Sequence, residues 1–267
     1  MSNWTEIKIN DWKDFTSALE NLQLERDWLS HWAFRGQSDS SWTLKPTILR
    51  QLERHGIGRQ MGIRFERTIL REFFAKAHLF ENFITRDFKE GNALVTFSLM
   101  QHYGASTRLL DWTRSPYVAL YFAINNNFSK DGVIYLFNQT LLNEITKDDY
   151  YKKEDNLFSE ENDSNFIMTL MSNFETRRSS SQQGIYSVAA NIDKDHATLI
   201  HSAFLEKNVN GKLYSCKLII DKEVKHEFLA RLNKLNLKAD QLFPDIYGFT
   251  NSLNDLLEIR GWEKKFV

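Results

Sequence analysis

A polar segment that runs directly into an apolar one is the feature that most constrains the fold, and it occupies residues 99–123 (LMQHYGASTRLLDWTRSPYVALYFA). Its second half predicts a helix, because Ser115 is a suitable N-cap, Pro116 fits the first helical position, and residues 117–124 are apolar on every side. A helix without a polar face must be buried in the core. Its N-terminus presents backbone N–H groups and a partial positive charge, so it can anchor an anionic group.

The polar half of this segment places many functional groups next to the predicted buried helix. Within thirteen residues it holds Gln101, His102, Tyr103, Thr107, Arg108, Asp111, Trp112 and Thr113. Burying such a group without a partner costs about 1–3 kcal/mol or more, so we expect Arg108 and Asp111 to be paired. One interpretation is a structural network in which these two side chains fix a turn around Gly104. The other interpretation is a ligand-binding site, and both stay open at this stage.

The composition indicates a well-folded chain with a large core. The 267 residues have a mass of 31.5 kDa, and 42% of them are hydrophobic, 26% are charged and three are prolines. The 34 basic and 35 acidic residues nearly cancel, which leaves no global charge for binding nucleic acid or a membrane. The arginines that cluster in one region are Arg50, Arg54, Arg59, Arg64, Arg67 and Arg71. We interpret them as the solvated face of a helix rather than as a nucleic-acid surface.

Cysteine content and hydropathy indicate the compartment. Cys216 is the one cysteine in the sequence, so no intramolecular disulfide can form and a reducing environment is expected. In an apolar strand it is a structural thiol rather than a nucleophile. The sequence shows neither a signal peptide nor an apolar run of about 18 residues that could cross a membrane. We therefore expect a cytoplasmic protein without a membrane partner.

Apolar periodicity predicts an α+β fold, in which a mixed or antiparallel central sheet is flanked by helices in a single compact domain. Predicted strands cover residues 4–9, the end of the segment 28–35, and residues 133–137, 185–189 and 212–220. Predicted helices cover residues 12–22, 48–52, 59–83, 93–100, 117–124, 221–235 and a last stretch that ends at Gly261. The long helix at residues 59–83 is expected to be part of the core.

Four other features carry more specific expectations. Gly36 is expected to let the chain turn sharply after Arg35, which would lie at the end of a strand. Residues 141–163 form a charged excursion that we expect to be exposed, and residues 166–174 are expected to form a short helix. Residues 177–184 are expected to form a polar loop, which either presents side chains at a cleft or is an ordinary surface loop.

The sequence contains no familiar catalytic motif. It has no Walker loop, no Rossmann glycine fingerprint, no H-E-x-x-H and no G-x-S-x-G, and its seven histidines show no metal-ligand spacing, so no metal site is expected. What remains is Arg35, the polar segment at residues 102–113, and Gln182 with Gln183 before a strand. Arginine binds phosphate oxygens, and aromatic rings can cover a base or nicotinamide. These residues outline a nucleotide pocket.

These residues resemble the FRG-domain family, which is named for the Phe-Arg-Gly found here at residues 34–36 and followed by Gln37. Residues 99–123 are close to the family's most characteristic segment. Weaker family-like pieces occur at residues 178–184, which include Gln-x-Gly, and at residues 242–253 (LFPDIYGFTNSL). Members of the family are often of unknown role, and some are encoded near bacterial phage-defence or mobile elements. The resemblance implies a single FRG-type domain over residues 1–267, with a core at about residues 28–260.

A more distant similarity links the chain to the arginine-serine-glutamate class of ADP-ribosyltransferases. In that class an aromatic-Arg-Gly strand holds the dinucleotide phosphates, and residues 34–36 look like its counterpart. Residues 106–107 and 122–123 are loosely similar to the Ser-Thr-Ser strand and the Phe-Ala helix end that follow in that class. The late motif that carries the catalytic glutamate has no match, because Gln-Gln-Gly at residues 182–184 leads into an isoleucine.

The resemblance implies roles for individual residues. Arg35, Asp111 and Gln183 are the candidate catalytic residues: Arg35 would clamp phosphate, and Asp111 or Gln183 would contact the ribose. Asp111 could replace the missing glutamate and stabilise an oxocarbenium-like transition state. The candidate ligand-binding residues are Gln37, His102, Tyr103, Thr107, Arg108 and Trp112, of which Tyr103 or Trp112 would stack a ring. No resident cofactor is expected, and NAD is the candidate substrate.

Two functional hypotheses follow. The first is a bacterial effector that acts on NAD or a nucleotide by ADP-ribosyl transfer or glycohydrolysis, as a toxin or in phage defence, with a protein target or an antitoxin-like partner. The second is a non-catalytic module that senses a nucleotide or a protein with the same pocket. The missing glutamate favours the second hypothesis.

Overall fold

The computed structural model describes residues 4–23, 31–80, 93–153, 159, 164–171, 177–206 and 214–264. Parts of several predicted elements lie outside these ranges. They are the start of the segment 28–35, the ends of the helices predicted at 59–83 and 166–174, most of 154–163, and the start of the strand predicted at 212–220.

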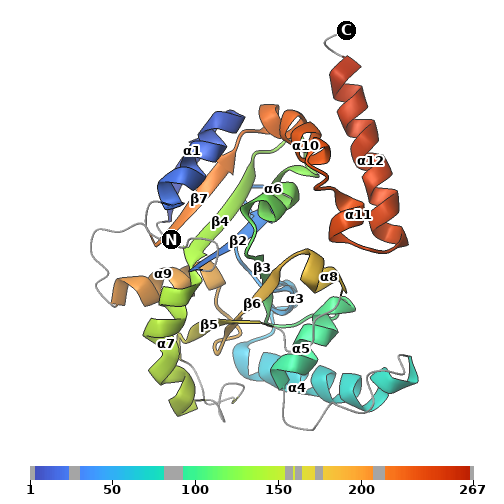
Figure 1. Ribbon diagram of the computed structural model, residues 1–267. Coiled ribbons are helices and arrows are strands. Elements are labelled where there is room, and N and C mark those ends of the chain that lie inside the picture. The colour runs from blue at the N-terminus through green and yellow to red at the C-terminus, as the bar shows by residue number, and fades with distance from the viewer. Residues whose placement is uncertain are drawn as a thin grey trace.

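A seven-stranded mixed sheet, counted over the described residues, forms the centre of the fold (Figure 1). Its spatial order is β1-β7-β4-β2-β3-β6-β5. β1 and β7 are parallel, and the other neighbouring strands are antiparallel. The predicted α+β class and mixed sheet are therefore confirmed. The strands are β1 (Thr5–Ile9), β2 (Trp32–Gln37), β3 (Leu110–Thr113), β4 (Gly132–Asn138), β5 (Ile167–Leu170), β6 (Gly184–Ala189) and β7 (Ser215–Ile220).

Helices cover both faces of this sheet. The first face packs against α1 (Trp12–Gln23), α6 (Pro116–Ile124) and α10 (Lys225–Lys234) in the largest hydrophobic cluster. The opposite face packs against α7 (Gln139–Lys153) and α9 (His196–Glu206). The charged region predicted as an exposed excursion therefore begins as a helix whose Leu142 is fully buried.

The remaining helices lie around the β3–β6–β5 end of the sheet and along its margin (Figure 1). Near β5 and β6 the chain forms α3, α4 and α5, and the C-terminal part forms α11 and α12 beside α10. These elements are α3 (Thr47–Arg54), α4 (Arg59–Lys76), the 3-10 turn η1 (Ala77–Leu79), α5 (Ala93–His102), α8 (Arg177–Ser181), the 3-10 turn η4 (Lys222–Val224), α11 (Ala239–Leu242) and α12 (Ile246–Glu263).

The helix predicted to be buried is α6, and it lies unusually close to the sheet. The Ser115 hydroxyl accepts a hydrogen bond from the backbone N–H of Val118, and Pro116 begins the helix, as predicted. Gly36 does not turn the chain, because β2 continues through it to Gln37. A Cβ atom on Gly36 would collide with the backbone carbonyl of Ala119 in α6, so glycine is required there for close packing of helix on strand.

Three other predictions about elements are wrong. Residues 167–170 form strand β5 at the edge of the sheet instead of a helix, because they pair with β6. The segment predicted as a polar loop contains the short helix α8. The last helix continues through Gly261 to Glu263, and Gly261 is not a stop.

The long helix α4 is not the core element that its periodicity predicts. Its buried positions include Ile63, but Phe65 is 44% exposed and Phe80, just beyond η1, is 83% exposed. Helical spacing of apolar residues identifies the helix, but it does not identify what the apolar face packs against.

Candidate functional site

The candidate site lies where the sheet divides into two halves. Within the described residues, β2 and β3 are joined at one registered pair, Phe34 with Thr113, whereas β2 pairs with β4 over six residues. A cavity of about 260 Å³ opens where the two strands separate. Its lining residues come from β2, α5, β3, α6, α8 and β6: Phe34, Arg35, Gly36, Gln101, His102, Asp111, Trp112, Thr113, Phe122, Arg178, Ser179, Gln182 and Tyr186.

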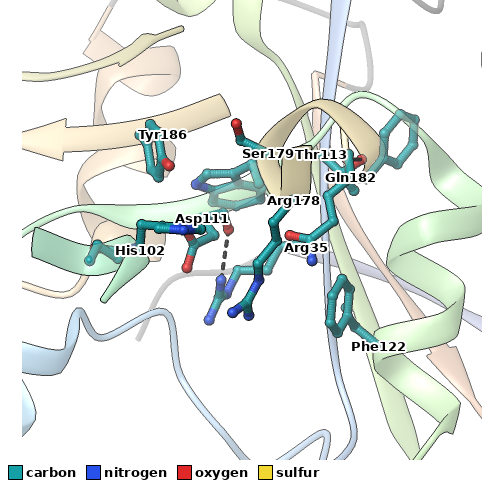
Figure 2. Close-up of a pocket in the computed structure, with 13 residues that line it drawn as sticks. Arg35, His102, Asp111, Thr113, Phe122, Arg178, Ser179, Gln182 and Tyr186 are labelled. Carbon is teal, nitrogen blue, oxygen red and sulfur yellow. Dashed lines mark hydrogen bonds between the residues drawn. The ribbon is translucent and has the colours of Figure 1, made fainter. Parts of the chain in front are cut away.

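Arg35 connects the two halves of the sheet across this opening. Its Nη1 donates a hydrogen bond of 2.7 Å to the backbone carbonyl of Asp111, the dashed line in Figure 2. Its Nε is buried without a hydrogen-bond partner among the described residues. Burial lowers the pKa of the guanidinium, with Asp111 raising it and Arg50 lowering it further, but an arginine remains cationic at neutral pH. Arg35 therefore places a desolvated positive charge in the lining of the cavity.

A second arginine faces the same cavity from α8. Figure 2 shows the side chains of Arg178 and Arg35 reaching into the same part of the pocket. The ring of Phe243 lies 4.5 Å from the Arg178 guanidinium carbon and supports it by a cation–π contact. Gln182 secures the end of α8, because its carbonyl accepts a 2.6 Å hydrogen bond from Thr113 and its side-chain amide donates to Leu242 at 3.1 Å. The position of Arg178 is thus fixed from two sides.

Aromatic side chains form the walls of the cavity. Trp112 is held by a buried relay, in which its Nε1 donates to the Ser187 hydroxyl and that hydroxyl contacts Nδ1 of His196, both at 2.8 Å. Burial, together with Arg35 and Arg108, lowers the pKa of His196 to about 3, so this imidazole is neutral and its Nδ1 can accept a hydrogen bond from the Ser187 hydroxyl. Tyr186 is a neutral phenol, because burial and then Asp111 raise its pKa to about 12.

His102 and Asp111 supply the remaining titratable groups. Burial and then the charge of Arg178 lower the pKa of His102, while Asp245 partly opposes this shift. The imidazole is therefore neutral at pH 7. Asp111 is exposed to water, and among the described residues that line the cavity it is the one carboxylate. Two arginines and one carboxylate give the lining a net positive charge.

The structure brings together four of the nine residues predicted for the site: Arg35, His102, Asp111 and Trp112. Three others lie away from the cavity. The Gln37 amide donates to the carbonyl of Thr43 at 3.3 Å, and the Thr107 hydroxyl donates to the side chain of Gln101. The ring of Tyr103 is 45% exposed and lies beside that of His102.

Gln183 is replaced in the cavity by its neighbour Gln182. Gln183 has a left-handed backbone with φ of 49°, and its carbonyl accepts from the backbone N–H of Arg114 at 3.1 Å. It therefore ends α8 and starts β6, which is a structural role. Side chains alternate around this turn, so Gln182 lines the pocket and Gln183 does not.

Arg108 belongs to a buried structural network and does not line the cavity. Its Nε lies 2.8 and 2.9 Å from the two carboxylate oxygens of Glu66, and its Nη2 also contacts Glu66. Nη1 donates to the carbonyls of Ala189 and Ala190 at 3.1 and 3.0 Å. The pairing of Arg108 with Asp111 is therefore wrong, although the expectation that Arg108 is paired is confirmed. Its partner comes from α4, 42 residues earlier in the chain.

The prediction missed several residues of the site, notably Arg178, Ser179, Tyr186 and Phe122. The polar run that begins with two arginines at 177–178 could have pointed to the side chains of α8. The alternating pattern of β6 could have pointed to Tyr186. Neither signal shows that these elements face β2.

Within the described part of the chain, no three His, Cys, Asp or Glu side chains gather closely enough to hold a metal ion. Among the described helices, none has the length and apolar character needed to span a bilayer.

Comparison with known proteins identifies a family. No curated protein and no solved structure matches the chain. The model of the FRG domain matches residues 30–132, which include β2, the polar segment that ends in β3, and α6. These elements supply Arg35, Asp111 and Trp112, but α8 and β6, which supply Arg178 and Tyr186, lie outside the match. This chain therefore contains an FRG domain, over residues 30–132.

Proposed function

We propose that the pocket binds a phosphate-bearing, ring-containing nucleotide, and that NAD is the substrate on which the protein acts. The observation that carries this proposal is the convergence of Arg35 and Arg178 on one cavity with aromatic walls. Guanidinium groups bind phosphate oxygens through paired N–H donors, and flat rings cover a base or nicotinamide.

The reaction that fits this lining is cleavage of the bond between nicotinamide and ribose. The bonding electrons leave with the pyridinium nitrogen, so the leaving group needs no proton. Positive charge then develops on the ribose, and the Asp111 carboxylate is the group in the lining that could stabilise it. Water completes glycohydrolysis and loses a proton, whereas a nucleophile on a target molecule completes ADP-ribosyl transfer.

The test is incubation of the purified protein with NAD, followed by mass spectrometry for free nicotinamide and for ADP-ribose on protein or nucleic acid. We expect nicotinamide release by the wild type and its loss in Arg35→Ala and Asp111→Asn. Arg71→Ala is the matched control, because Arg71 is an exposed arginine on α4 outside the cavity lining. Equal release by all four proteins would rule out this pocket as the active site.

A non-catalytic sensor is the second candidate function, and one observation favours it. Asp111 contacts Arg35 through its backbone carbonyl, while its carboxylate is exposed, and the sequence lacks the late glutamate of the transferases. An exposed carboxylate is a weaker stabiliser of developing charge than a buried one. Saturable binding of NAD or ADP-ribose with no released nicotinamide would support the sensor over the enzyme.

The biological setting that we propose rests on the family resemblance. It is a toxin or phage-defence effector in the bacterial cytoplasm, with a protein target or an antitoxin-like partner. Expression of the wild type and of Arg35→Ala in a bacterial host tests this setting. Growth inhibition by the wild type alone is the expected result, and equal growth would contradict it.

A further inference from the structure

The C-terminal helix α12 carries its apolar residues on the outside. The residues on its inner face are small, polar or aliphatic: Gly248, Ser252, Asp255 and Ile259. Its outer face carries Ile246, Phe249, Leu253 and Leu257, which are 76%, 50%, 46% and 70% exposed. We call these four residues the α12 stripe. An ordinary surface helix has the opposite arrangement, so the α12 stripe indicates a partner.

Specific contacts fix this orientation, so the helix cannot rotate to bury the stripe. The Asp255 carboxylate accepts a hydrogen bond of 2.8 Å from the Tyr121 hydroxyl of α6. The Asp245 carboxylate caps the helix by accepting from the N–H of Gly248 at 2.8 Å. Gly248 lies against the carbonyl of Phe243, where a Cβ atom would not fit. Turning the stripe inward would break these contacts and expose the inner face.

The spacing of the stripe suits another helix as its partner. Its residues recur at i, i+3, i+7 and i+11, which is one continuous line of about 16 Å along the helix axis. Figure 1 shows α12 at the margin of the molecule, with its C-terminal end extending away from the sheet. A second helix can therefore approach the stripe without meeting the central sheet.

We propose that the α12 stripe is a self-association surface, on which the α12 helices of two copies pack antiparallel about a twofold axis. With the neighbouring Tyr247, which is 65% exposed, the stripe leaves roughly 600 Å² of apolar surface on each copy. Complete burial of these five side chains on both copies would cover about 1,200 Å², which is the lower limit for stable interfaces. An antiparallel pair also opposes the helix dipoles and places the Asp245 end of one helix near the Arg260 end of the other.

The proposed interface is close to the pocket but does not depend on its function. Phe243, which supports Arg178, and Asp245, which acts on His102, directly precede α12. Self-association would place one pocket near each end of the helix pair. The proposal holds whether or not the pocket binds a nucleotide.

Sedimentation of the full chain tests the proposal. We expect a species of twice the 31.5 kDa chain mass at micromolar concentrations, and Leu253→Glu/Leu257→Glu to raise its dissociation constant at least about 100-fold. Leu205→Glu is the matched control, because Leu205 on α9 is 64% exposed and lies outside the stripe. A wild type that remains monomeric at 100 µM, even if the stripe captures another protein, would overturn the proposal.

Cross-linking tests the antiparallel arrangement and remains informative if the glutamate variants fold poorly. Cys216 is buried and its thiol pKa is raised to about 12, so an added surface cysteine is the reactive one. Leu253→Cys lies near the twofold axis, and oxidation should cross-link it between copies. Ile246→Cys lies at the end of the stripe and should not cross-link. Equal cross-linking at both positions would mean a parallel pair, and none at either would contradict the interface.

Discussion

At the scale of single residues, the arginines of this chain divide by what they contact. Arg108 is satisfied by the protein itself, whereas Arg35 and Arg178 line a cavity. A guanidinium that is fully paired stabilises the fold, and one that is not can bind a ligand. Two predictions test this division.

The first concerns Arg178 and its effect on His102. Burial lowers the pKa of His102 and the nearby Arg178 lowers it further, so Arg178→Gln should raise that pKa toward its ordinary value without restoring it fully. NMR titration of the His102 ring measures the shift. Arg177→Gln, the exposed neighbour outside the cavity lining, should leave the pKa unchanged. An unchanged pKa of His102 in Arg178→Gln would mean that Arg178 does not lie close enough to His102 to act on it.

The second concerns the buried pair of Arg108 and Glu66. Arg108→Met should lower the free energy of unfolding by about 3–5 kcal/mol, because it leaves the Glu66 carboxylate buried without its partner. Urea denaturation measures the loss. The double variant Glu66→Leu/Arg108→Met should recover part of it, since no unpaired charge remains. A loss below about 1 kcal/mol in the single variant would mean that the pair is not structural.

The role of a residue could be predicted from the sequence where that role depends on residues next to it in the chain. The strand that carries Phe-Arg-Gly could be predicted, although it continues beyond Arg35 to Gln37 instead of ending there. The partner of Arg108 could not be predicted, because Glu66 lies on another helix and looks like any other helical carboxylate in the sequence. Gln182 and Gln183 could not be distinguished, because the left-handed backbone at Gln183 decides which side chain faces the pocket.

At the scale of elements, the contact of α6 with β2 and β4 positions the pocket. Gly36 and Gly132 both lie where a Cβ atom would collide with backbone atoms of α6. At these two points the backbone of the helix contacts the backbone of a strand with no side chain between them. This close contact fixes Phe34 and Phe122, which line the cavity, relative to each other.

Replacing one glycine tests this close packing. Gly36→Ala should destabilise the protein by about 1–3 kcal/mol, because α6 must move away from the sheet. Gly261→Ala is the matched control, since a Cβ there meets open space within α12, and it should be neutral or stabilise by up to about 1 kcal/mol. Thermal unfolding compares the two. Equal effects would show that Gly36 is not a packing site.

Elements could be predicted where the local sequence signals agree. The prediction was wrong where pairing with a distant part of the chain determines whether a segment is a helix or a strand. The α6 helix follows from its cap, its proline and its uniform apolar run, all within ten residues. The strand β5 was predicted as a helix because a short apolar run suits either state, and pairing with β6 decides for strand. The exposed faces of α4 and α12 could not be predicted, because periodicity does not say which face another element covers.

At the scale of the whole molecule, acid should destabilise the fold partly through His196. The pKa of this imidazole is about 3 in the folded protein, because of burial and then Arg35 and Arg108, and about 6.5 when unfolded. Between these two values the imidazole is protonated in the unfolded chain and neutral in the folded chain. The free energy of unfolding therefore falls as pH drops from about 6.5 toward 3. His196 contributes up to about 1.4 kcal/mol per pH unit in this window.

Urea midpoints measured from pH 7.5 to pH 4.5 test this dependence. His196→Gln should be less stable than the wild type at pH 7.5, because the Ser187 relay is altered, but should lose stability less steeply on acidification. A His196→Gln slope as steep as that of the wild type between pH 6.5 and 5 would assign the acid sensitivity to other groups.

In the proposed function, Arg35 is the residue that makes this pocket a nucleotide site. Calorimetric titration with ADP-ribose, which carries the phosphates and ribose but has no nicotinamide to lose, tests it independently of turnover. We expect saturable binding to the wild type and to Arg71→Gln, and binding weaker by about 100-fold in Arg35→Gln. Absence of binding by the wild type, or equal binding by all three proteins, would show that Arg35 does not make this pocket a nucleotide site.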